Sequence, residues 1–410
     1  MRISTSMIFD TGVANINKQW SQLLHLQQQV ASGRRILTPS DDPVAAARAL
    51  EVTQSSDILT QYATNQQNAT SALGLAETQL TSLNDMFARL KELTVQAGNA
   101  TLSASDRQSI AFELRARFDE LLGLANAADG QGQYLFSGFM GSTKPFAGTV
   151  DQLNAVASQE ITYDGDDGQR RLQVSATRML EVSDAGTDVF MRIKNGNGYF
   201  ATNYAGTNNG SGIIDIGNVT DPAAWNALAD KNLSINFTSA TTYDIVDSTS
   251  TVIASGTYQS GVPIAIPAGG ASVIITGAPA SGDTFTIEPS SSQSVFKTLA
   301  NLIGALESGG SSAVESAQYS SEIGFALANF DRANDNILRV RSMIGSRMNE
   351  LESLDSVNQD LQLQYQQTLS NLQDLDYAKA ISDLTRKQTD LQAAQQSFMK
   401  ISQLSLFNYF

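Results

Sequence analysis

The stretch of sequence that decides the fold is the last one, residues 345–410, which reads GSRMNELESLDSVNQDLQLQYQQTLSNLQDLDYAKAISDLTRKQTDLQAAQQSFMKISQLSLFNYF. It contains no glycine after Gly345 and no proline, the residue types that most often end a helix. Its apolar residues recur at three- and four-residue steps, and their phase slips near Asp376. The first run is Leu354, Leu361, Tyr365, Leu372 and Leu375, and the second is Ile381, Leu384, Leu391, Phe398, Ile401, Leu404 and Phe407. A seam of this period predicts a long helical segment that packs on a partner helix. The alternative is an amphipathic helix that packs on its own domain.

The N-terminal residues carry the same spacing. The seam residues there are Val13, Ile16, Trp20, Leu23 and Val30. They predict a helix over residues 10–31 that ends at a glycine cap, Ser32-Gly33. The linker that follows closes on Asp42 as N-cap and Pro43 at the first helical position, so a second helix is expected from Pro43 to about Ala97.

The third helix and the middle of the chain follow. Ser105-x-x-Gln108 predicts a capping box for a helix that reaches Gly130. Residues 131–289 are then rich in Gly, Thr, Ser, Asn and β-branched residues. Residues 161–163 and 171–174 flank the turn 164–168, which predicts a hairpin. Further strands are expected at residues 233–237, 272–276 and 284–287, and helical patterns resume after Pro289.

This order predicts an α+β multidomain protein: a long antiparallel, coiled-coil-like helical bundle built from both termini, with β-rich domains inserted in the middle. The expected domains are terminal assembly helices at 1–38 and 377–410, a helical bundle domain at 39–131 and 290–376, a β domain at 132–195, and an inserted β region at 196–289.

Composition excludes several classes of protein. The chain has 410 residues, no cysteine and a net charge of −15, so disulfides and thiolate metal sites are impossible and a nucleic-acid partner is disfavoured. Its basic excess lies at the two ends and its acidic excess in the middle. The N-terminal sequence lacks the apolar run of a cleaved signal peptide, and no apolar run is long enough to span a membrane.

Catalytic constellations are not found in the sequence. The single histidine, His25, lies near the apolar stripe of its helix and is interpreted as a structural or surface residue. The acidic turn 164–168 lacks the spacing and the terminal glutamate of a calcium loop, which favours a solvated turn. We therefore expect no enzyme activity, no metal and no cofactor.

The terminal helices are expected to need partners. Two paired helices leave much of their apolar surface in water, and isolated helices of this length are marginal. The ends should therefore be mobile in the free monomer, protease-sensitive at 1–40 and 377–410, and ordered by contact with other copies.

Four stretches carry a resemblance to a known family. They are residues 1–4 (MRIS), 32–50 (SGRRILTPSDDPVAAARAL), 132–146 (GQYLFSGFMGSTKPF) and 376–410, which ends in ISQLSLFNYF. Together with the helical spacing they cover about 1–195 and 290–410. The chain resembles the flagellin superfamily of the bacterial flagellum, and within it the members that lie between hook and filament.

The resemblance implies a noncatalytic, extracellular adaptor at the hook–filament junction. It implies other copies in a ring, a hook-associated protein on the hook side, flagellin on the filament side, and an export chaperone at the C-terminal helix, residues 377–410. It also implies type III export without a cleaved signal peptide, and no membrane or nucleic-acid partner. If these positions have the role that they have in the family, the seam residues would line an inner tube of helices: Val13, Ile16, Trp20, Leu23, Ile381, Leu384, Leu391 and Phe398.

Two alternatives stay open at this point. Flagellin itself shares the helix–β–helix order, and a secreted adhesin could bind a ligand through its β region. Residues 196–288 depart from the shorter members of the family, so the role of this insertion is not implied by the resemblance.

Overall fold

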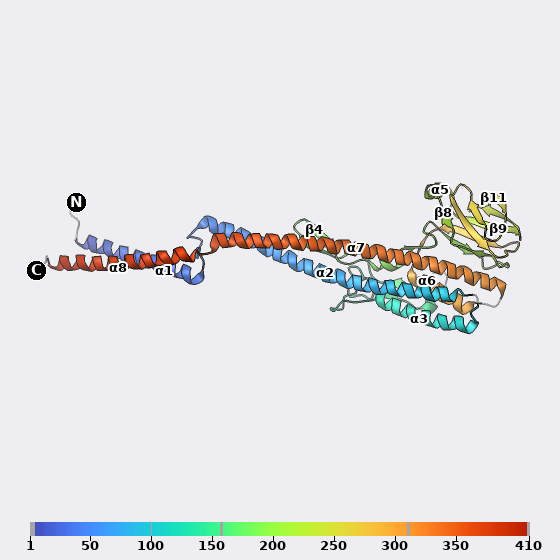
Figure 1. Cartoon of the computed structure of the whole chain (residues 1–410), viewed down its shortest axis with the longest axis horizontal. Helices are drawn as coiled ribbons and strands as arrows, with labels where there is room; N and C mark the ends of the chain where they lie inside the picture. The colour runs from blue at the N-terminus through green and yellow to red at the C-terminus, as the bar shows by residue number, and fades with distance from the viewer. Residues whose placement is uncertain (1–4, 100, 156–158, 310–311, 408–410) are drawn as a thin grey trace. The chain divides into compact units, whose positions relative to one another are not determined.

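The computed structural model describes residues 5–99, 101–155, 159–309 and 312–407, and it does not describe the side chains of residues 5, 6, 8 and 402–407. Figure 1 shows the elements of the chain, which divide into two compact units. The first contains residues 1–65 and 352–410, and the second contains residues 66–351.

Long helices account for most of the described chain. They are α1 (Thr5–Ser32), α2 (Pro43–Ala97), α3 (Ala104–Ala125), α6 (Val295–Ser308), α7 (Ala313–Gln373) and α8 (Tyr377–Phe407), with short helices α4 (Val150–Ala155), η1 (Thr187–Met191) and α5 (Pro222–Ala227). The start of α2 is confirmed at Pro43, where the Asp42 carboxylate accepts from the Ala45 backbone N–H at 3.0 Å. A side-chain oxygen that satisfies a free N–H of the first turn fixes the start of a helix.

Two predicted helix features are wrong. The capping box of α3 is formed by Ser103 and Asp106, not by Ser105 and Gln108, and the helix ends at Ala125 rather than at Gly130. In the C-terminal segment, α7 ends at Gln373 and α8 begins at Tyr377, which is where the sequence predicts the start of the terminal helix. Asp376 begins α8 by accepting from the Lys379 backbone N–H at 3.1 Å. The slip in apolar phase near Asp376 is the sequence signal of this break.

The helical part of the second unit packs around an aromatic cluster. Phe296 of α6 lies 5.8 Å from Phe118 of α3, 5.4 Å from Phe146 and 6.0 Å from Phe190, measured between ring centroids. All four rings are fully buried. Aromatic pairs at such distances add to the free energy gained from burial alone, so this cluster ties the first β segments to the helices.

Residues 132–195 form short strand pairs beside these helices. β1 (Phe146–Ala147) pairs with β2 (Thr162–Tyr163), β3 (Arg171–Ser175) pairs with β4 (Arg178–Glu181), and β5 (Ile193–Lys194) pairs with β15 (Ser292–Gln293), all antiparallel. The predicted hairpin between 161–163 and 171–174 is therefore wrong: each of these segments has another partner.

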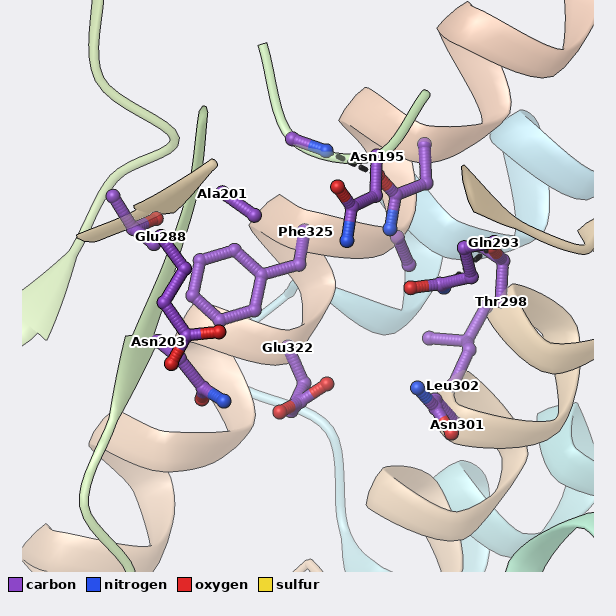
Figure 2. Close-up of a pocket in the computed structure, with 14 residues that line it drawn as sticks. Asn195, Ala201, Asn203, Glu288, Gln293, Thr298, Asn301, Leu302, Glu322 and Phe325 are labelled. Atoms are coloured by element: carbon purple, nitrogen blue, oxygen red, sulfur yellow. Dashed lines mark hydrogen bonds between the residues drawn. The ribbon is translucent and has the colours of Figure 1, made fainter. Parts of the chain in front are cut away.

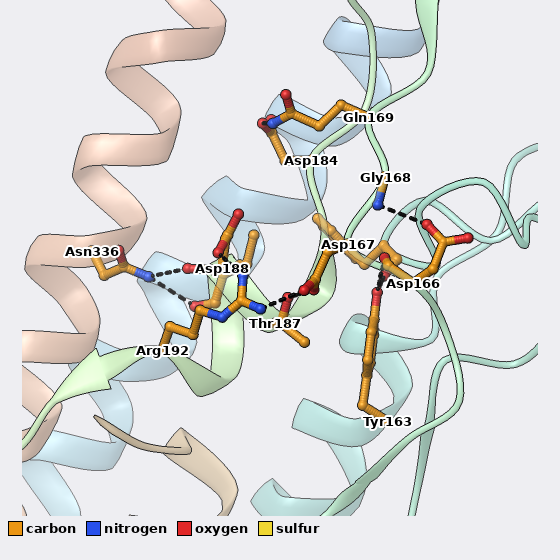
Figure 3. A network of polar contacts seen from close by, with 12 residues as sticks. Tyr163, Asp166, Asp167, Gly168, Gln169, Asp184, Thr187, Asp188, Arg192 and Asn336 are labelled. Atoms are coloured by element: carbon orange, nitrogen blue, oxygen red, sulfur yellow. Dashed lines mark hydrogen bonds and ion pairs between the residues drawn. The ribbon is translucent and has the colours of Figure 1, made fainter. Parts of the chain in front are cut away.

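The acidic turn 164–168 explains that error (Figure 3). The Asp166 carboxylate accepts from the backbone N–H groups of Phe139 at 2.9 Å and Gly168 at 2.7 Å. Asp167 accepts from Thr187 at 2.5 Å, and together with an ion pair to Arg192 this bond holds its pKa below the ordinary value. The turn is anchored to distant segments by its own side chains, so it does not close a local hairpin.

The inserted residues fold into two packed antiparallel sheets. The first has the strand order β11 (Val252–Thr257), β10 (Thr242–Val246), β9 (Leu233–Ser239), β14 (Thr284–Pro289) and β6 (Phe200–Tyr204). In the second, β13 (Ala271–Thr276) pairs with β12 (Pro263–Ile266), β7 (Ile213–Ile214) and β8 (Asn218–Val219). The predicted strands at 233–237, 272–276 and 284–287 are confirmed as parts of β9, β13 and β14. Their inward residues, with Phe200 and Trp225, form a buried core between the sheets.

One face of α7 holds this inserted sandwich. Tyr204 of β6 donates to the Glu322 carboxylate at 3.1 Å, the Gly196 backbone N–H donates to Asn329 at 2.8 Å, and Phe325 packs against the sandwich core. Residues 322, 325 and 329 share a helical face because they are spaced by three and four. Burial raises the pKa of Glu322 above its ordinary value, and this outweighs the opposing effect of the Tyr204 hydrogen bond.

The raised pKa of Glu322 predicts a pH-dependent effect of Glu322→Gln. Because the carboxyl is more basic in the folded than in the unfolded chain, its contribution to stability is fully present below the ordinary value of 4.5 and is lost as pH rises through the folded-state pKa. Glutamine keeps the acceptor for Tyr204 and carries no charge. We expect the variant to gain ~1–2 kcal/mol relative to wild type above that pKa and little below 4.5, measured by chemical unfolding across pH. A difference that does not change with pH would contradict this.

Candidate assembly interface

The two terminal helices pack on each other in antiparallel fashion (Figure 1). Phe9 near the start of α1 lies 5.0 Å from Phe398 near the end of α8, between ring centroids. Further along α1, Gln22 accepts from the Lys387 ammonium at 3.1 Å, and Gly33 lies against Tyr377 at the start of α8. Early residues of one helix thus meet late residues of the other.

The seam between α1 and α8 contains six of the predicted residues. Leu23 and Leu391 are buried, with 5 % and 6 % of their surface exposed. The half-buried members are Ile16, Val30, Leu384 and Phe398. Gly12 allows the close approach at the far end, because a Cβ there would lie 2.7 Å from the Phe398 ring. This seam is made within one chain.

A second apolar stripe on the same pair remains in water. Its members, which we name the apolar flank, are Val13, Trp20 and Leu24 of α1 and Ile381 and Met399 of α8, with 37 %, 45 %, 49 %, 52 % and 54 % of their surface exposed. On each helix these positions lie roughly 60° around the axis from the seam, in the direction of increasing residue number. Because the helices are antiparallel, equal rotations bring both sets to the same side of the pair. The flank residues therefore share one side of the pair.

The opposite side of the pair is polar. It carries a shallow hollow of about 490 Å³, lined by Ser21, Gln22, His25, Leu26, Gln29, Asp383, Arg386 and Lys387. Arg386 pairs with Asp383 at 2.8 Å. The terminal pair thus has two chemically different faces, and its apolar face is the one whose burial lowers the free energy.

Backbone hydrogen bonds connect the two stretches of residues at the end of the pair where α1 ends and α8 begins. The Leu375 N–H donates to the Gly33 carbonyl at 2.9 Å, and the Arg35 N–H donates to the Gln373 carbonyl at 2.7 Å. The Arg35 guanidinium also donates to the Leu372 carbonyl at 2.7 Å, at the C-terminus of α7. The turn that joins α1 to α2 and the break that separates α7 from α8 are therefore held together.

Asp41 organises the same turn. Its carboxylate accepts from the Thr38 and Leu37 backbone N–H groups at 2.8 and 2.9 Å, and from His25 at 3.1 Å. The Thr38 hydrogen bond is the largest cause of a lowered Asp41 pKa. His25 therefore contacts the turn after its own helix, in a structural role.

A prediction follows for Gly33→Ala. Gly33 has φ +69°, and a Cβ there would lie 2.8 Å from the Tyr377 hydroxyl. Left-handed backbone costs a residue with a Cβ about 1–2 kcal/mol, so we expect a loss of this size and faster amide exchange at residues 375–380. The matched control is Gly345→Ala in α7, where a Cβ meets open space and a small gain of ~0.5–1 kcal/mol is expected. Equal effects of the two substitutions would contradict a stabilising role of Gly33 at the start of α8.

The predicted interface residues thus divide into two groups. Ile16, Leu23, Val30, Leu384, Leu391 and Phe398 lie in the seam, whereas Val13, Trp20 and Ile381 lie on the apolar flank. Ile401 is 52 % exposed and lies off both stripes. Leu404 and Phe407 lie outside the residues whose side chains are described. Sequence reasoning missed Leu24 and Met399, and the adjacent leucines at 23 and 24 were the available signal.

Within the described residues, no group of three or more His, Asp or Glu side chains is arranged to hold a metal ion. No described helix is both long and apolar enough to cross a membrane.

Comparisons with known proteins identify the family to which this architecture belongs. Residues 3–140 match the family model of the bacterial flagellin N-terminal helical region, and residues 327–410 match that of the C-terminal helical region. Flagellar hook-associated protein 3 of Escherichia coli K12 is 26 % identical over 407 residues, 99 % of each chain. The crystal structure of flagellar hook-associated protein 3 from Legionella pneumophila aligns with a TM-score of 0.72 at 32 % identity, over 78 % of this chain and 98 % of that one.

Flagellin is a partial match by comparison. Escherichia coli K12 flagellin is 35 % identical over 150 residues, which is 37 % of this chain and 29 % of that protein. The extent of the matches decides between the two, because the hook-associated proteins align along nearly their whole length and flagellin over little more than a third of this chain. The chain belongs to the flagellar hook-associated protein 3 family of the flagellin superfamily.

Proposed function

We propose that this protein is a structural adaptor that joins hook-side proteins to the flagellin filament by helix–helix packing between subunits. The observation that carries the proposal is the apolar flank. Five large apolar side chains on one side of a two-helix pair have between 37 % and 54 % of their surface exposed, and family membership supplies neighbours that can cover them. Burying the exposed half of each contributes ~4–7 kcal/mol per copy in total.

The partners follow from this arrangement. Other copies in a ring, a hook-associated protein on the hook side and flagellin on the filament side would each present helices to the flank. The terminal helices of this chain match the helical regions of flagellin, so one type of helix seam can serve contacts with other copies and with flagellin. Such a protein needs no catalytic group, and we propose that it is not an enzyme.

The exposed apolar residues of α8 also need a binding partner before assembly. We propose that a cytoplasmic export chaperone binds α8, on which Ile381, Met399 and Ile401 are each more than half exposed. Export would then proceed without a cleaved signal peptide, to the hook–filament junction outside the cell. Mobility of the free ends stays a prediction, which limited proteolysis at residues 1–40 and 377–410 tests.

A deletion strain tests the adaptor function. Cells without the protein should build hooks and release flagellin into the medium, and electron microscopy should show hooks without filaments. Normally attached filaments in the deletion strain would overturn the proposal. If purified protein alone formed long filaments, it would act as a flagellin instead. If removal of residues 196–288 abolished surface attachment and spared motility, the insertion would be an adhesin.

A further inference from the structure

A polar cavity lies where the inserted sandwich meets α6 and α7 (Figure 2). Its volume is about 170 Å³, enough for roughly five or six water molecules or a small organic ligand. It is lined by β6 and β14 of the sandwich on one side and by α6 and α7 on the other. Its chemistry comes mainly from Glu288, Glu322, Phe325, Asn203, Asn301 and Asn329.

The wall of this cavity is acidic. Glu322 and Glu288 both line it, and no lysine, arginine or histidine is among its lining residues in the described part of the chain. Glu288 is exposed, whereas Glu322 is half-buried and accepts one hydrogen bond from Tyr204 at 3.1 Å. Anionic ligands are disfavoured here, because two carboxylates would repel them in surroundings that screen charge less than water does.

Several lining groups are fixed in place by hydrogen bonds. Asn329 accepts from the Gly196 backbone N–H at 2.8 Å, and Gln293 donates to the Thr298 hydroxyl at 2.9 Å. The Phe325 ring is packed against the sandwich core and labelled beside Glu288 and Glu322 in Figure 2. A site with fixed walls loses little conformational entropy when a ligand enters.

An opening connects the cavity to the surface. A second, more open hollow of about 700 Å³ shares Asn203, Asn301 and Glu322 with it. Lys297 lines only this outer hollow and donates its ammonium to the Leu153 carbonyl at 2.5 Å. A small molecule can therefore reach Glu322 from outside.

We propose that this cavity binds a small organic cation, an alkylammonium or guanidinium group, with the Glu322 carboxylate as its counter-ion and the Phe325 ring as an apolar wall. A half-buried carboxylate without a cation beside it is partly desolvated at a cost, and a charge-assisted hydrogen bond to a bound cation offsets that cost. A cation beside an aromatic ring gains further attraction. A neutral polyol would fill the space and leave the carboxylate uncompensated. The inference goes beyond the adaptor function and does not depend on it.

The test is calorimetric titration of the full chain with agmatine, which carries both cationic groups, beside the neutral analogue butylurea and glucose. We expect one agmatine per chain and no heat from butylurea or glucose. Glu322→Gln should weaken agmatine binding by about 10- to 100-fold, since it removes the charge and keeps the shape. Glu288→Gln should weaken it less, because that residue is exposed.

The control is Asp360→Asn, which removes an equal charge from an exposed residue of α7 outside the cavity lining. Unchanged affinity in this variant separates binding in the cavity from general attraction to an acidic protein. Unfolding curves of each variant confirm that it is folded. The proposal is overturned if agmatine does not bind, if Glu322→Gln binds it as well as wild type does, or if glucose binds in its place.

Discussion

The double variant Trp20→Glu, Ile381→Glu is expected to abolish filament attachment while the monomer keeps its fold. Trp20 and Ile381 are 45 % and 52 % exposed in the chain, so carboxylates there remain hydrated in the monomer. When the apolar flank is covered by a neighbouring helix, the same carboxylates lose their water without a partner. An uncompensated buried charge costs about 3–5 kcal/mol, which weakens association by at least about 100-fold. Electron microscopy of complemented deletion cells counts the attached filaments.

The matched control places the same charges outside the apolar flank. Gln22 and Ser382 are exposed residues of α1 and α8 that do not belong to the flank, and Gln22→Glu keeps a partner in Lys387. We expect Gln22→Glu, Ser382→Glu to restore attachment close to the wild-type level. Helix content of both monomers, measured by circular dichroism, should match wild type. Equal loss of attachment in the two variants would show that charge alone, and not the flank, is responsible.

The second large effect is expected in the core of the other unit. Phe296→Ala should reduce the free energy of unfolding by about 3–5 kcal/mol, because it leaves a cavity among Phe118, Phe146 and Phe190. Denaturant unfolding of the full chain measures this loss. Phe296→Leu fills most of the space and should cost less than half as much. A loss below about 1 kcal/mol for the alanine variant would mean that the cluster does not hold the β segments to α3 and α6.

Local signals made parts of this fold predictable. Asp42 and Pro43 determine where α2 begins, because an N-cap acceptor and a proline at the first helical position act over a few residues. The strands at 233–237, 272–276 and 284–287 were predictable for the same reason, since β-branched alternation is local. The pairing of these strands is set by contacts between distant residues.

Errors arose where distant contacts override local patterns. The turn 164–168 has the composition of a hairpin loop, yet Asp166 bonds to the backbone of Phe139, 27 residues earlier in the chain. The break between α7 and α8 was signalled by the phase slip near Asp376, but the backbone bonds to Gly33 and Arg35 that compensate for the interrupted helix were not predicted. Neither partner can be identified from the local sequence.

The apolar positions of the candidate interface were predictable, but their division between the seam and the apolar flank was not. The three- and four-residue spacing identified Leu23 and Leu391, which the chain buries in its own seam. It did not distinguish them from Trp20 and Ile381, which lie one step around each helix and stay exposed. That distinction depends on how far each helix is rotated about its axis in the pair, and periodicity leaves this angle undetermined.

The most direct test of the apolar flank is the accessibility of Leu24→Cys to a maleimide before and after assembly. The chain has no cysteine, so a single label reports one position. We predict rapid labelling in the free protein, where Leu24 is 49 % exposed, and strong protection in assembled flagella. Ser281→Cys, in an exposed turn of the inserted sandwich, should label equally well in both states. Equal labelling of Leu24→Cys before and after assembly would contradict the account.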